Sequence, residues 1–309
     1  MCIRDRFSTS HAARIDLPVN RVSLFVDQAF MTVRERPSIE IDTRVRRRED
    51  VLIGGLDLRA GSKTILRVDA TRQLQKFEEE AAFESVNLAA ALNRRSEVAG
   101  LSLRHRATAL TTFVVLGEAL RERFVASSTR DSDSVRVTPG VELDPRALIG
   151  GRAFVGYRRF IIRSGVAPKF TGLVASVELA STIRNTTRLS VRANRDVAYS
   201  YDVTSPYYLL TTAGVSVVRR LGQNWDLGVA VGRDNLNYER WTIPPATIAD
   251  AVGLPPRFET VNVVGGSTGY RLGDNMRLAV SYDFTRRTST RLRRPYEGAK
   301  IISQFIYGS

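Results

Sequence analysis

The sequence predicts an all-β chain that forms a single antiparallel transmembrane β-barrel of about 14–16 strands. Three observations lead to this prediction. Large apolar residues alternate with small or polar ones over segments of about 10 residues or more. Compact turn sequences recur about 40 residues apart, and longer polar stretches lie between them. Finally, no run of about 18 apolar residues is present, which excludes a membrane-spanning helix.

Composition excludes several classes of function. The 309 residues carry a formal net charge of +14, and nearly all the basic residues are arginine. Nucleic-acid-binding proteins cluster their basic residues on one face or arm, whereas here arginine recurs along the whole chain, so we expect no nucleic acid partner. Cys2, His11 and His105 cannot supply a disulfide framework or the usual metal or acid–base cluster. We therefore expect no enzyme activity, no catalytic residues, no metal and no cofactor.

The first element is the N-terminus, where MCIRDR resembles a translated sequencing adapter. We expect residues 1–7 to be an artefact and residues 8–309 to be the barrel, with an N-terminal part missing. The lack of a signal peptide then carries no information about compartment.

Turns define the next elements in chain order. Glycine, asparagine, aspartate and proline supply the φ values that tight reversals need. Turn sequences lie at 17–20, 59–63, 106–110, 143–148, 183–187, 221–224 and 272–275. Longer connections lie near 34–47, 75–93, 125–131, 164–170, 200–205, 239–255 and 290–295. Short periplasmic turns that alternate with longer extracellular loops are typical of an outer-membrane barrel.

Between these connections about fifteen segments are predicted as strands. From Met276 to Phe284 every second residue is large and apolar, so one face suits lipid and the other suits water. The segments are 10–17, 21–33, 48–58, 64–74, 94–106, 110–124, 132–142, 150–163, 171–181, 187–199, 206–219, 225–238, 257–271, 276–289 and 296–307. Their odd number agrees with a lost N-terminal strand, because bacterial barrels are usually even. A soluble sheet with one polar face is the alternative, but soluble strands average only about 5–6 residues.

Two features are expected at the rims. Aromatic residues should form interfacial girdles: Phe124, Phe160, Tyr201, Tyr207, Tyr208, Tyr238, Trp241 and Tyr296 at the loop ends of strands, and Trp225, Tyr270, Phe305 and Tyr307 at the turn ends. Residues 78–93, EEEAAFESVNLAAALN, favour a short helix in an extracellular loop. That loop either folds into the barrel as a constriction or caps its surface.

Arginine placement is the main chemical signal. An arginine that faces lipid near the bilayer midplane costs roughly 2–4 kcal/mol, so arginines within strands should face the lumen. The lumen-lining candidates are Arg67, Arg104, Arg152, Arg158, Arg188, Arg192 and Arg277, with Asp69, Glu118, Asp226 and Asp283 among them. An excess of arginine biases a wet lumen toward anions, unless the charges pair and fill it. The glycines of VVGGSTG (263–269) lack the lysine and helix of a phosphate loop and are expected to ease strand curvature or face a crowded lumen.

The run RDSDSVRVTPGVELDPRALIGGRAFVGYRRF (130–160), together with PSIEIDTRVRRRED (37–50), resembles a β-barrel porin family of proteobacterial outer membranes. Its frame of strand, turn and strand is centred on Asp144 and Pro145. The resemblance implies a single antiparallel barrel. Members of the family are mostly uncharacterised, and some are associated with capsule or exopolysaccharide production.

Together these features predict a passive pore of the bacterial outer membrane for small solutes, with a preference for anions. Two alternatives remain: an export barrel for capsular polysaccharide or exopolysaccharide, and a structural or surface barrel without transport. The expected partners are outer-membrane lipid, lipopolysaccharide and the barrel assembly machinery, with polysaccharide export proteins in the second case. The C-terminal strand carries Phe305 and Tyr307 as an assembly signal, although Gly308 and Ser309 follow them.

Overall fold

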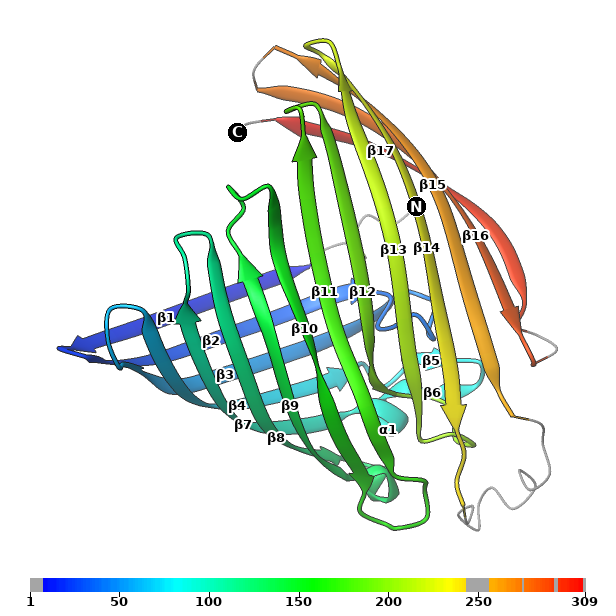
Figure 1. Ribbon diagram of the computed structural model, residues 1–309. Coiled ribbons are helices and arrows are strands. Elements are labelled where there is room, and N and C mark those ends of the chain that lie inside the picture. The colour runs from blue at the N-terminus through cyan, green and yellow to red at the C-terminus, as the bar shows by residue number, and fades with distance from the viewer. Residues whose placement is uncertain (1–7, 243–255, 274, 292–293, 308–309) are drawn as a thin grey trace.

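The computed structural model describes residues 8–242, 256–273, 275–291 and 294–307, in which fifteen strands form one antiparallel sheet in sequence order (Figure 1). The strands are β1 (Thr9–Val19), β2 (Val22–Glu35), β3 (Val45–Arg59), β4 (Thr64–Phe77), β7 (Arg94–Arg106), β8 (Thr111–Phe124), β9 (Ser132–Leu143), β10 (Ile149–Ile162), β11 (Phe170–Ile183), β12 (Thr187–Tyr199), β13 (Tyr207–Leu221), β14 (Trp225–Glu239), β15 (Phe258–Leu272), β16 (Met276–Ser289) and β17 (Tyr296–Tyr307). All fifteen predicted segments are strands, so the predicted all-β antiparallel barrel is confirmed.

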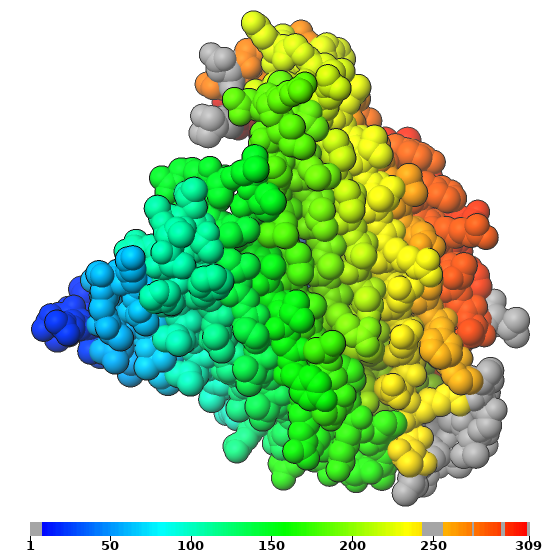
Figure 2. Space-filling view, in the orientation of Figure 1, coloured from blue at the N-terminus to red at the C-terminus, as the bar shows by residue number. Residues whose placement is uncertain are grey.

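The strands form one continuous curved wall. Their lengths run from 11 residues in β1 to 15 in β3, and each therefore reaches the roughly 9–11 residues that a membrane-crossing strand needs. In the space-filling view the wall follows the order of the sequence from one edge to the other (Figure 2). β1 and β17 are its edges, and within the described ranges they form no ladder with each other. None of the helices described is long and apolar enough to cross a membrane.

Alternation sets the two faces of the wall. Leu56, Val68 and Leu101 are direct cross-strand neighbours, and all three are exposed on the outer face. The same row continues to Val137 and Leu173, which are 49% and 61% exposed. Large apolar residues exposed in rows suit contact with lipid, because in a soluble sheet they would lie in a core. The inner face carries the other residues of each strand.

Tight turns and longer connections alternate, as predicted. At the turn end, Asn20, Asn185 and Gly222 have positive φ values of 55°, 56° and 63°. The Asp144 turn is held by its own carboxylate, which accepts hydrogen bonds from the backbone N–H of Arg146 at 2.9 Å and from its guanidinium. These bonds lower the pKa of Asp144 to about 2. Residues 243–255, within the predicted loop 239–255, lie outside the described residues.

The short helix predicted within 78–93 is present, but it covers only the last part of that segment. The structure has a small hairpin, β5 (Ala82–Phe83) and β6 (Val86–Asn87), followed by the five-residue helix α1 (Leu88–Leu92). Glu84 and Ser85 have positive φ values of 49° and 68°, so the chain reverses there and cannot continue a helix. The helix begins where the Asn87 side chain accepts a hydrogen bond from the backbone N–H of Ala90 at 2.8 Å.

The loop end of the barrel contains a packed core. Leu88, Ala91 and Leu92 of α1 are buried against Ile41 of the β2–β3 loop and Tyr201 of the β12–β13 loop. The inward-facing Val45 and Phe77 at the ends of β3 and β4 complete this cluster. The loop over 78–93 therefore folds into the barrel, which favours the constriction over the surface cap.

The aromatic girdle predicted at the loop ends is wrong. Phe160, Tyr207, Tyr208 and Tyr201 are almost completely buried, with exposures of 1% or less. They lie beneath the loops that fold inward. The same cores contain Tyr238 and Trp241, and Phe124 packs against Tyr199 beside them. At the turn end, by contrast, Trp225 and Tyr270 pack with ring centroids 4.8 Å apart, and Trp225 is 50% exposed on the outer face.

Candidate functional site

The inner face of the wall carries a ladder of ion pairs between neighbouring strands. Arg67 on β4 lies directly opposite Asp57 on β3, and its Nε and Nη2 donate to the two carboxylate oxygens at 2.6 and 2.7 Å. The guanidinium also stacks 4.7 Å from the ring of Phe25 on β2. A bidentate pair on a stacked ring holds the Arg67 side chain along the wall.

Other predicted lumen residues are paired in the same way. Arg277 on β16 and Asp226 on β14 are the predicted residues that the structure brings together as an ion pair, at 2.6 Å. The remaining pairs are Arg104 with Glu142 at 2.5 Å, Arg152 with Glu178 at 2.9 Å, Arg158 with Asp196 at 2.6 Å, and Glu118 with Arg136. Each of these arginines is thus neutralised by a carboxylate of the wall.

The partners Asp57, Glu142, Glu178, Asp196 and Arg136 were missed by the sequence analysis. Three of them could have been found from the register of neighbouring strands, because Asp57 lies directly opposite Arg67, Glu178 opposite Arg152 and Arg136 opposite Glu118. The others could not. Asp196, for example, contacts Arg158 and Arg136 at 2.6 and 3.1 Å from a strand that neighbours neither of theirs.

Glycines leave room for charged side chains on this face. A Cβ atom at Gly100 would lie 2.7 Å from Asp69 Oδ2, and one at Gly265 would lie 2.3 Å from Asp283 Oδ1. A Cβ atom at Gly269 would meet the guanidinium of Arg277 at 2.5 Å. Asp69 and Asp283 thus lie along the inner face of the wall. Gly265 and Gly269 of the VVGGSTG segment face the crowded lumen, which confirms that expectation.

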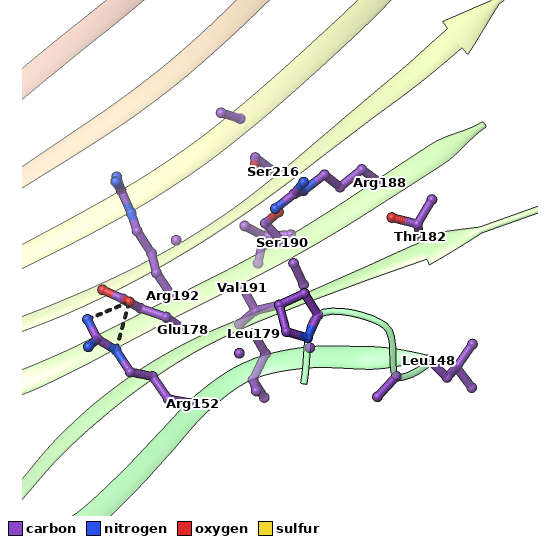
Figure 3. A pocket seen from close by; sticks show the side chains of 18 of the residues that line it. Leu148, Arg152, Glu178, Leu179, Thr182, Arg188, Ser190, Val191, Arg192 and Ser216 are labelled. Atoms are coloured by element: carbon purple, nitrogen blue, oxygen red, sulfur yellow. Dashed lines mark hydrogen bonds and ion pairs between the residues drawn. The ribbon is translucent and has the colours of Figure 1, made fainter. Parts of the chain in front are cut away.

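A cavity of about 1110 Å³ opens on the inner face of β10 to β14, toward the turn end (Figure 3). Arg152, Arg188 and Arg192 line it, with Glu178 bonded to Arg152. Arg192 extends across β13 and β14 over two glycines, since a Cβ atom at Gly214 would lie 2.8 Å from its Nε and one at Gly232 would lie 3.5 Å from its Nη2.

Two guanidinium groups in this cavity differ from the paired arginines named above. Within the part of the chain that the structure describes, neither Arg188 nor Arg192 has a hydrogen bond or an ion pair, and both are exposed to the cavity. Among the described residues, the carboxylates that line the cavity are Glu142 and Glu178, which bind Arg104 and Arg152. Asp234 on β14 attracts Arg192 without forming an ion pair with it. The cavity therefore carries a net positive charge that an anion could occupy.

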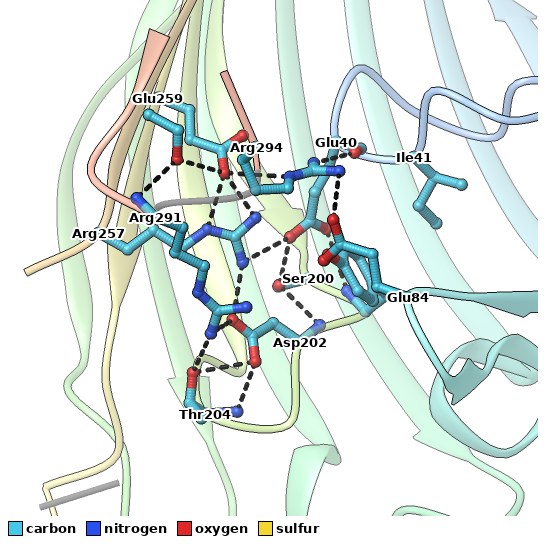
Figure 4. Close-up of polar contacts among 12 residues, drawn as sticks. Glu40, Ile41, Glu84, Ser200, Asp202, Thr204, Arg257, Glu259, Arg291 and Arg294 are labelled. Carbon is cyan, nitrogen blue, oxygen red and sulfur yellow. Dashed lines mark hydrogen bonds and ion pairs between the residues drawn. The ribbon is translucent and has the colours of Figure 1, made fainter. Parts of the chain in front are cut away.

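A second set of charges closes the loop end, and we call it the loop-end cluster (Figure 4). It comprises Glu40, Glu84, Asp202, Arg257, Glu259, Arg287, Arg291 and Arg294. Arg257 is central: it contacts Asp202 at 2.7 Å, Glu259 at 2.8 Å and Glu40 at 3.5 Å. Its guanidinium also lies 3.8 Å from the Tyr238 ring. Such dense pairing is what permits these charges to be buried.

The loop-end cluster joins strands from opposite ends of the sheet. Arg287 on β16 binds Glu259 at 2.5 Å and donates to the backbone oxygens of Ile39 and Glu40 in the β2–β3 loop. Arg294 donates to the backbone oxygen of Glu40 at 2.5 Å and forms an ion pair with Glu84 at 3.2 Å. The β2–β3 loop thus spans the barrel to β16. The sequence analysis missed this cluster, although part of it lies in the PSIEIDTRVRRRED segment.

Burial dominates the electrostatics of Glu40. Its carboxylate accepts from the Ser200 hydroxyl at 2.6 Å and from the Tyr201 backbone N–H at 3.0 Å. Complete burial nevertheless raises the pKa of Glu40 above its ordinary value, because desolvation outweighs the attraction of Arg257 and these hydrogen bonds. The opposite holds for Arg257, whose pKa is raised because the surrounding acids outweigh its burial.

Comparisons with known proteins agree with this architecture. The family model described as "Putative beta-barrel porin 2" matches residues 93–304. No curated protein sequence matches the chain. Among solved structures, the FrpB iron transporter from Neisseria meningitidis superposes with a TM-score of 0.54 at 9% identity, covering 97% of this chain and 57% of that one.

Two further structures show lower similarity. The siderophore receptor PirA from Pseudomonas aeruginosa has a TM-score of 0.45 at 10% identity, with 96% of this chain and 67% of that one covered. The copper transporter OprC has a TM-score of 0.46 at 8% identity, with 97% and 64% covered. The chain thus spans about 57–67% of the length of these three structures.

Proposed function

The chain belongs to the family described as "Putative beta-barrel porin 2", and from that membership we propose that it is a passive outer-membrane pore that admits small solutes and prefers anions. In this proposal the turn end faces the periplasm and the loop end faces outward, as in other outer-membrane barrels. The solutes enter from the loop end and pass along the charged inner face.

The observation that carries the anion preference is the pair Arg188 and Arg192. Five other arginines of the inner face each have a carboxylate oxygen within 3.1 Å: Arg67, Arg104, Arg152, Arg158 and Arg277. In the cavity between β10 and β14 the two guanidinium groups face water without such partners in the described residues. A fixed positive charge in a wet lumen concentrates anions and repels cations.

The narrow part of the proposed pore is the loop end. Glu40, Leu88 and Tyr201 are buried there, with exposures of 1% or less, so the inward loops fill much of the cross-section. A constriction of this kind limits the size of solute that passes. It also means that selectivity for charge and selectivity for size belong to different parts of the barrel.

The first prediction tests the charge selectivity. In planar bilayers with a salt gradient, the wild-type chain should form channels whose reversal potential indicates a preference for anions. Arg188→Gln with Arg192→Gln should shift that potential toward zero or to cation preference, because two positive charges without an ion-pair partner in the described residues are removed. Arg219→Gln is the matched control, since Arg219 is an exposed arginine on the outer face of β13, and it should leave the potential unchanged.

The same recordings can contradict the proposed anion preference. A wild-type cation preference, or an unchanged reversal potential in the double variant, would contradict it. Complete absence of channels would instead support a barrel without transport. The loop-end cluster favours that second candidate, because its buried ion pairs tie the loops across the barrel.

A further inference from the structure

The outer face has a hollow of its own near the loop end. It measures about 1080 Å³ and extends across β2, β3, β4, β7, β8, β9 and β10. Its floor is apolar and includes Val26, Leu52 and Val135, which are 48%, 44% and 57% exposed. In strand register these residues lie on the same face as Leu56, Val68 and Leu101, so the hollow belongs to the lipid-facing surface.

The side of the hollow nearer the loop end is charged. Arg72, Glu97, Arg121 and Asp133 are successive cross-strand neighbours on β4, β7, β8 and β9, and Arg159 lies next to them on β10. Because these positions share the outer face, the charges border the apolar floor directly. We call Arg72, Arg121 and Arg159 the rim arginines.

The rim arginines have no partners, whereas the acidic residues beside them do. Within the described ranges, Arg72, Arg121 and Arg159 form no hydrogen bond or ion pair, and all three are exposed. Glu97 is bound by Arg95, and Asp133 is bound by Arg123 at 2.8 Å and approached by Arg163 at 3.8 Å. The three guanidinium groups therefore remain available to an anion outside the chain.

The positive charge continues beyond the rim. Arg48 lies directly opposite Lys76, and Arg95 directly opposite Arg123, on the same outer face. Like charges in direct cross-strand positions destabilise a sheet by themselves. Glu97 and Asp133 offset the repulsion between Arg95 and Arg123. Arg48 and Lys76 form no ion pair in the described residues, so their charge adds to the attraction for an external anion.

We propose that this hollow binds a phosphorylated lipid of the outer leaflet, of the lipid A class. The apolar floor takes an acyl chain, and the rim arginines bind the headgroup phosphates, whose geometry suits bidentate contact with guanidinium. The site is at the loop end, which is the level of the outer-leaflet headgroups. This inference rests on the proposed placement in the outer membrane and not on the activity of the pore.

Charge complementarity together with the apolar floor favours a lipid over other anions. Inorganic phosphate would use the rim and leave the floor exposed to water, and a zwitterionic lipid would bring an ammonium group to a positive rim. A second copy of this chain would bring its own basic outer face to the same surface. A phosphorylated lipid A matches the floor and the rim at once.

The test measures lipid binding to the full chain in detergent by native mass spectrometry. The probes are bis-phosphorylated lipid A, dephosphorylated lipid A and phosphatidylethanolamine, with inorganic phosphate as competitor. The test variant is Arg72→Gln with Arg121→Gln and Arg159→Gln. The matched control is Arg219→Gln with Arg233→Gln and Arg286→Gln, which removes three charges from the outer face of β13, β14 and β16.

We expect the wild type and the control to bind bis-phosphorylated lipid A about ten-fold or more tighter than the other lipids, since charge-assisted hydrogen bonds contribute that much. The test variant should lose this preference. Equal binding of dephosphorylated lipid A, displacement by inorganic phosphate alone, or unchanged binding in the test variant would overturn the proposal. So would a dimer of the chain that occupies the surface and dissociates in the test variant.

Two readouts separate this proposal from that of the pore. Heat-dependent mobility on gels verifies that each variant folds as a barrel, so that lost binding is not lost structure. Conductance of the test variant should equal that of the wild type, because the rim arginines are not in the lumen. If the wild type forms no channels but binds bis-phosphorylated lipid A, the pore proposal fails and this one stands.

Discussion

At the scale of single residues, the face of the strand and the cross-strand partner together decide what a charge does. Arg67 and Arg72 lie five positions apart on β4 and have the same side chain. Arg67 faces inward, where Asp57 neutralises it at 2.6 Å. Arg72 faces outward at the edge of the apolar surface and has no partner among the described residues. Alternation along the strand predicts that Arg67 and Arg72 face opposite sides of the wall. Only the register of neighbouring strands shows which of the two has an ion-pair partner.

A glycine in β10 provides a prediction at this scale. Gly151 has a φ of +125°, and a Cβ atom there would lie 2.0 Å from the backbone oxygen of Glu178 on the neighbouring strand. Gly151→Ala should therefore lower the free energy of unfolding by about 2 kcal/mol or more, through backbone strain and separation of the strands. The measurement is urea unfolding in lipid vesicles, followed by tryptophan fluorescence.

Gly117→Ala on β8 is the control for that substitution. A Cβ atom at Gly117 would have the Leu101 oxygen as its nearest neighbour, at 3.9 Å, so no atom has to move. Its stability should stay close to that of the wild type. Equal stability of the two alanine variants would show that β10 and β11 are not as closely spaced as described here.

At the scale of elements, the loops and the strand ends form one structure at the loop end. Leu88 of α1, Ile41 of the β2–β3 loop and Tyr201 of the β12–β13 loop share a core, although they are far apart in sequence. The buried ion pairs of the loop-end cluster connect the same loops to β15 and β16. These loops are therefore part of the folded core and not flexible surface segments.

Two adjacent arginines of β16 test this element. Arg287 is 1% exposed and holds Glu259 and the Ile39 oxygen, whereas Arg286 is 62% exposed and pairs with Glu297. Arg287→Met should lower the free energy of unfolding by about 3–5 kcal/mol, because it leaves buried acceptors unpaired. Arg286→Met should cost less than about 1 kcal/mol, as for other exposed ion pairs. Comparable effects of the two substitutions in urea unfolding would refute this assignment.

At the scale of the whole molecule, the barrel combines a polar ladder, an apolar exterior and a filled loop end. β1 and β17 are the two edges of the wall. The β2–β3 loop, which lies near the β1 edge, nevertheless reaches Arg287 and Arg294 near the β17 edge. Contacts between loops therefore tie together parts of the wall that no strand ladder joins in the described residues. Glu40 is the residue at which the β2–β3 and β12–β13 loops meet.

The stability of this connection should depend on pH through Glu40. Its pKa is raised in the folded state above the 4.5 of an ordinary glutamate, because it is buried. Because the pKa of Glu40 is higher in the folded state, its contribution to the free energy of unfolding is complete below pH 4.5 and is lost as the pH rises through the folded pKa. The difference in Tm between the wild type and Glu40→Gln should therefore move in favour of the wild type as the pH falls from about 8 toward 4.5.

Calorimetry of both proteins over this pH range measures the effect. The glutamine variant keeps the size of the side chain and removes only the titration, so other acids cancel in the difference. A difference that is constant with pH, or that moves in favour of the variant on acidification, would show that Glu40 is not buried as an acid.

The sequence by itself determined the barrel, because strand alternation and tight turns are local properties that one strand and its hairpin satisfy alone. Every predicted strand is present, and Arg188, Arg192 and Arg277 lie on the inner face of the wall. Tertiary structure decided which charges are neutralised, since Asp196 and Glu142 reach Arg158 and Arg104 across an intervening strand. It also decided that Tyr207 and Tyr208 are buried, because loops from distant parts of the chain cover them. Alternation gives the face of a residue, but what covers that face depends on segments that only the tertiary fold brings together.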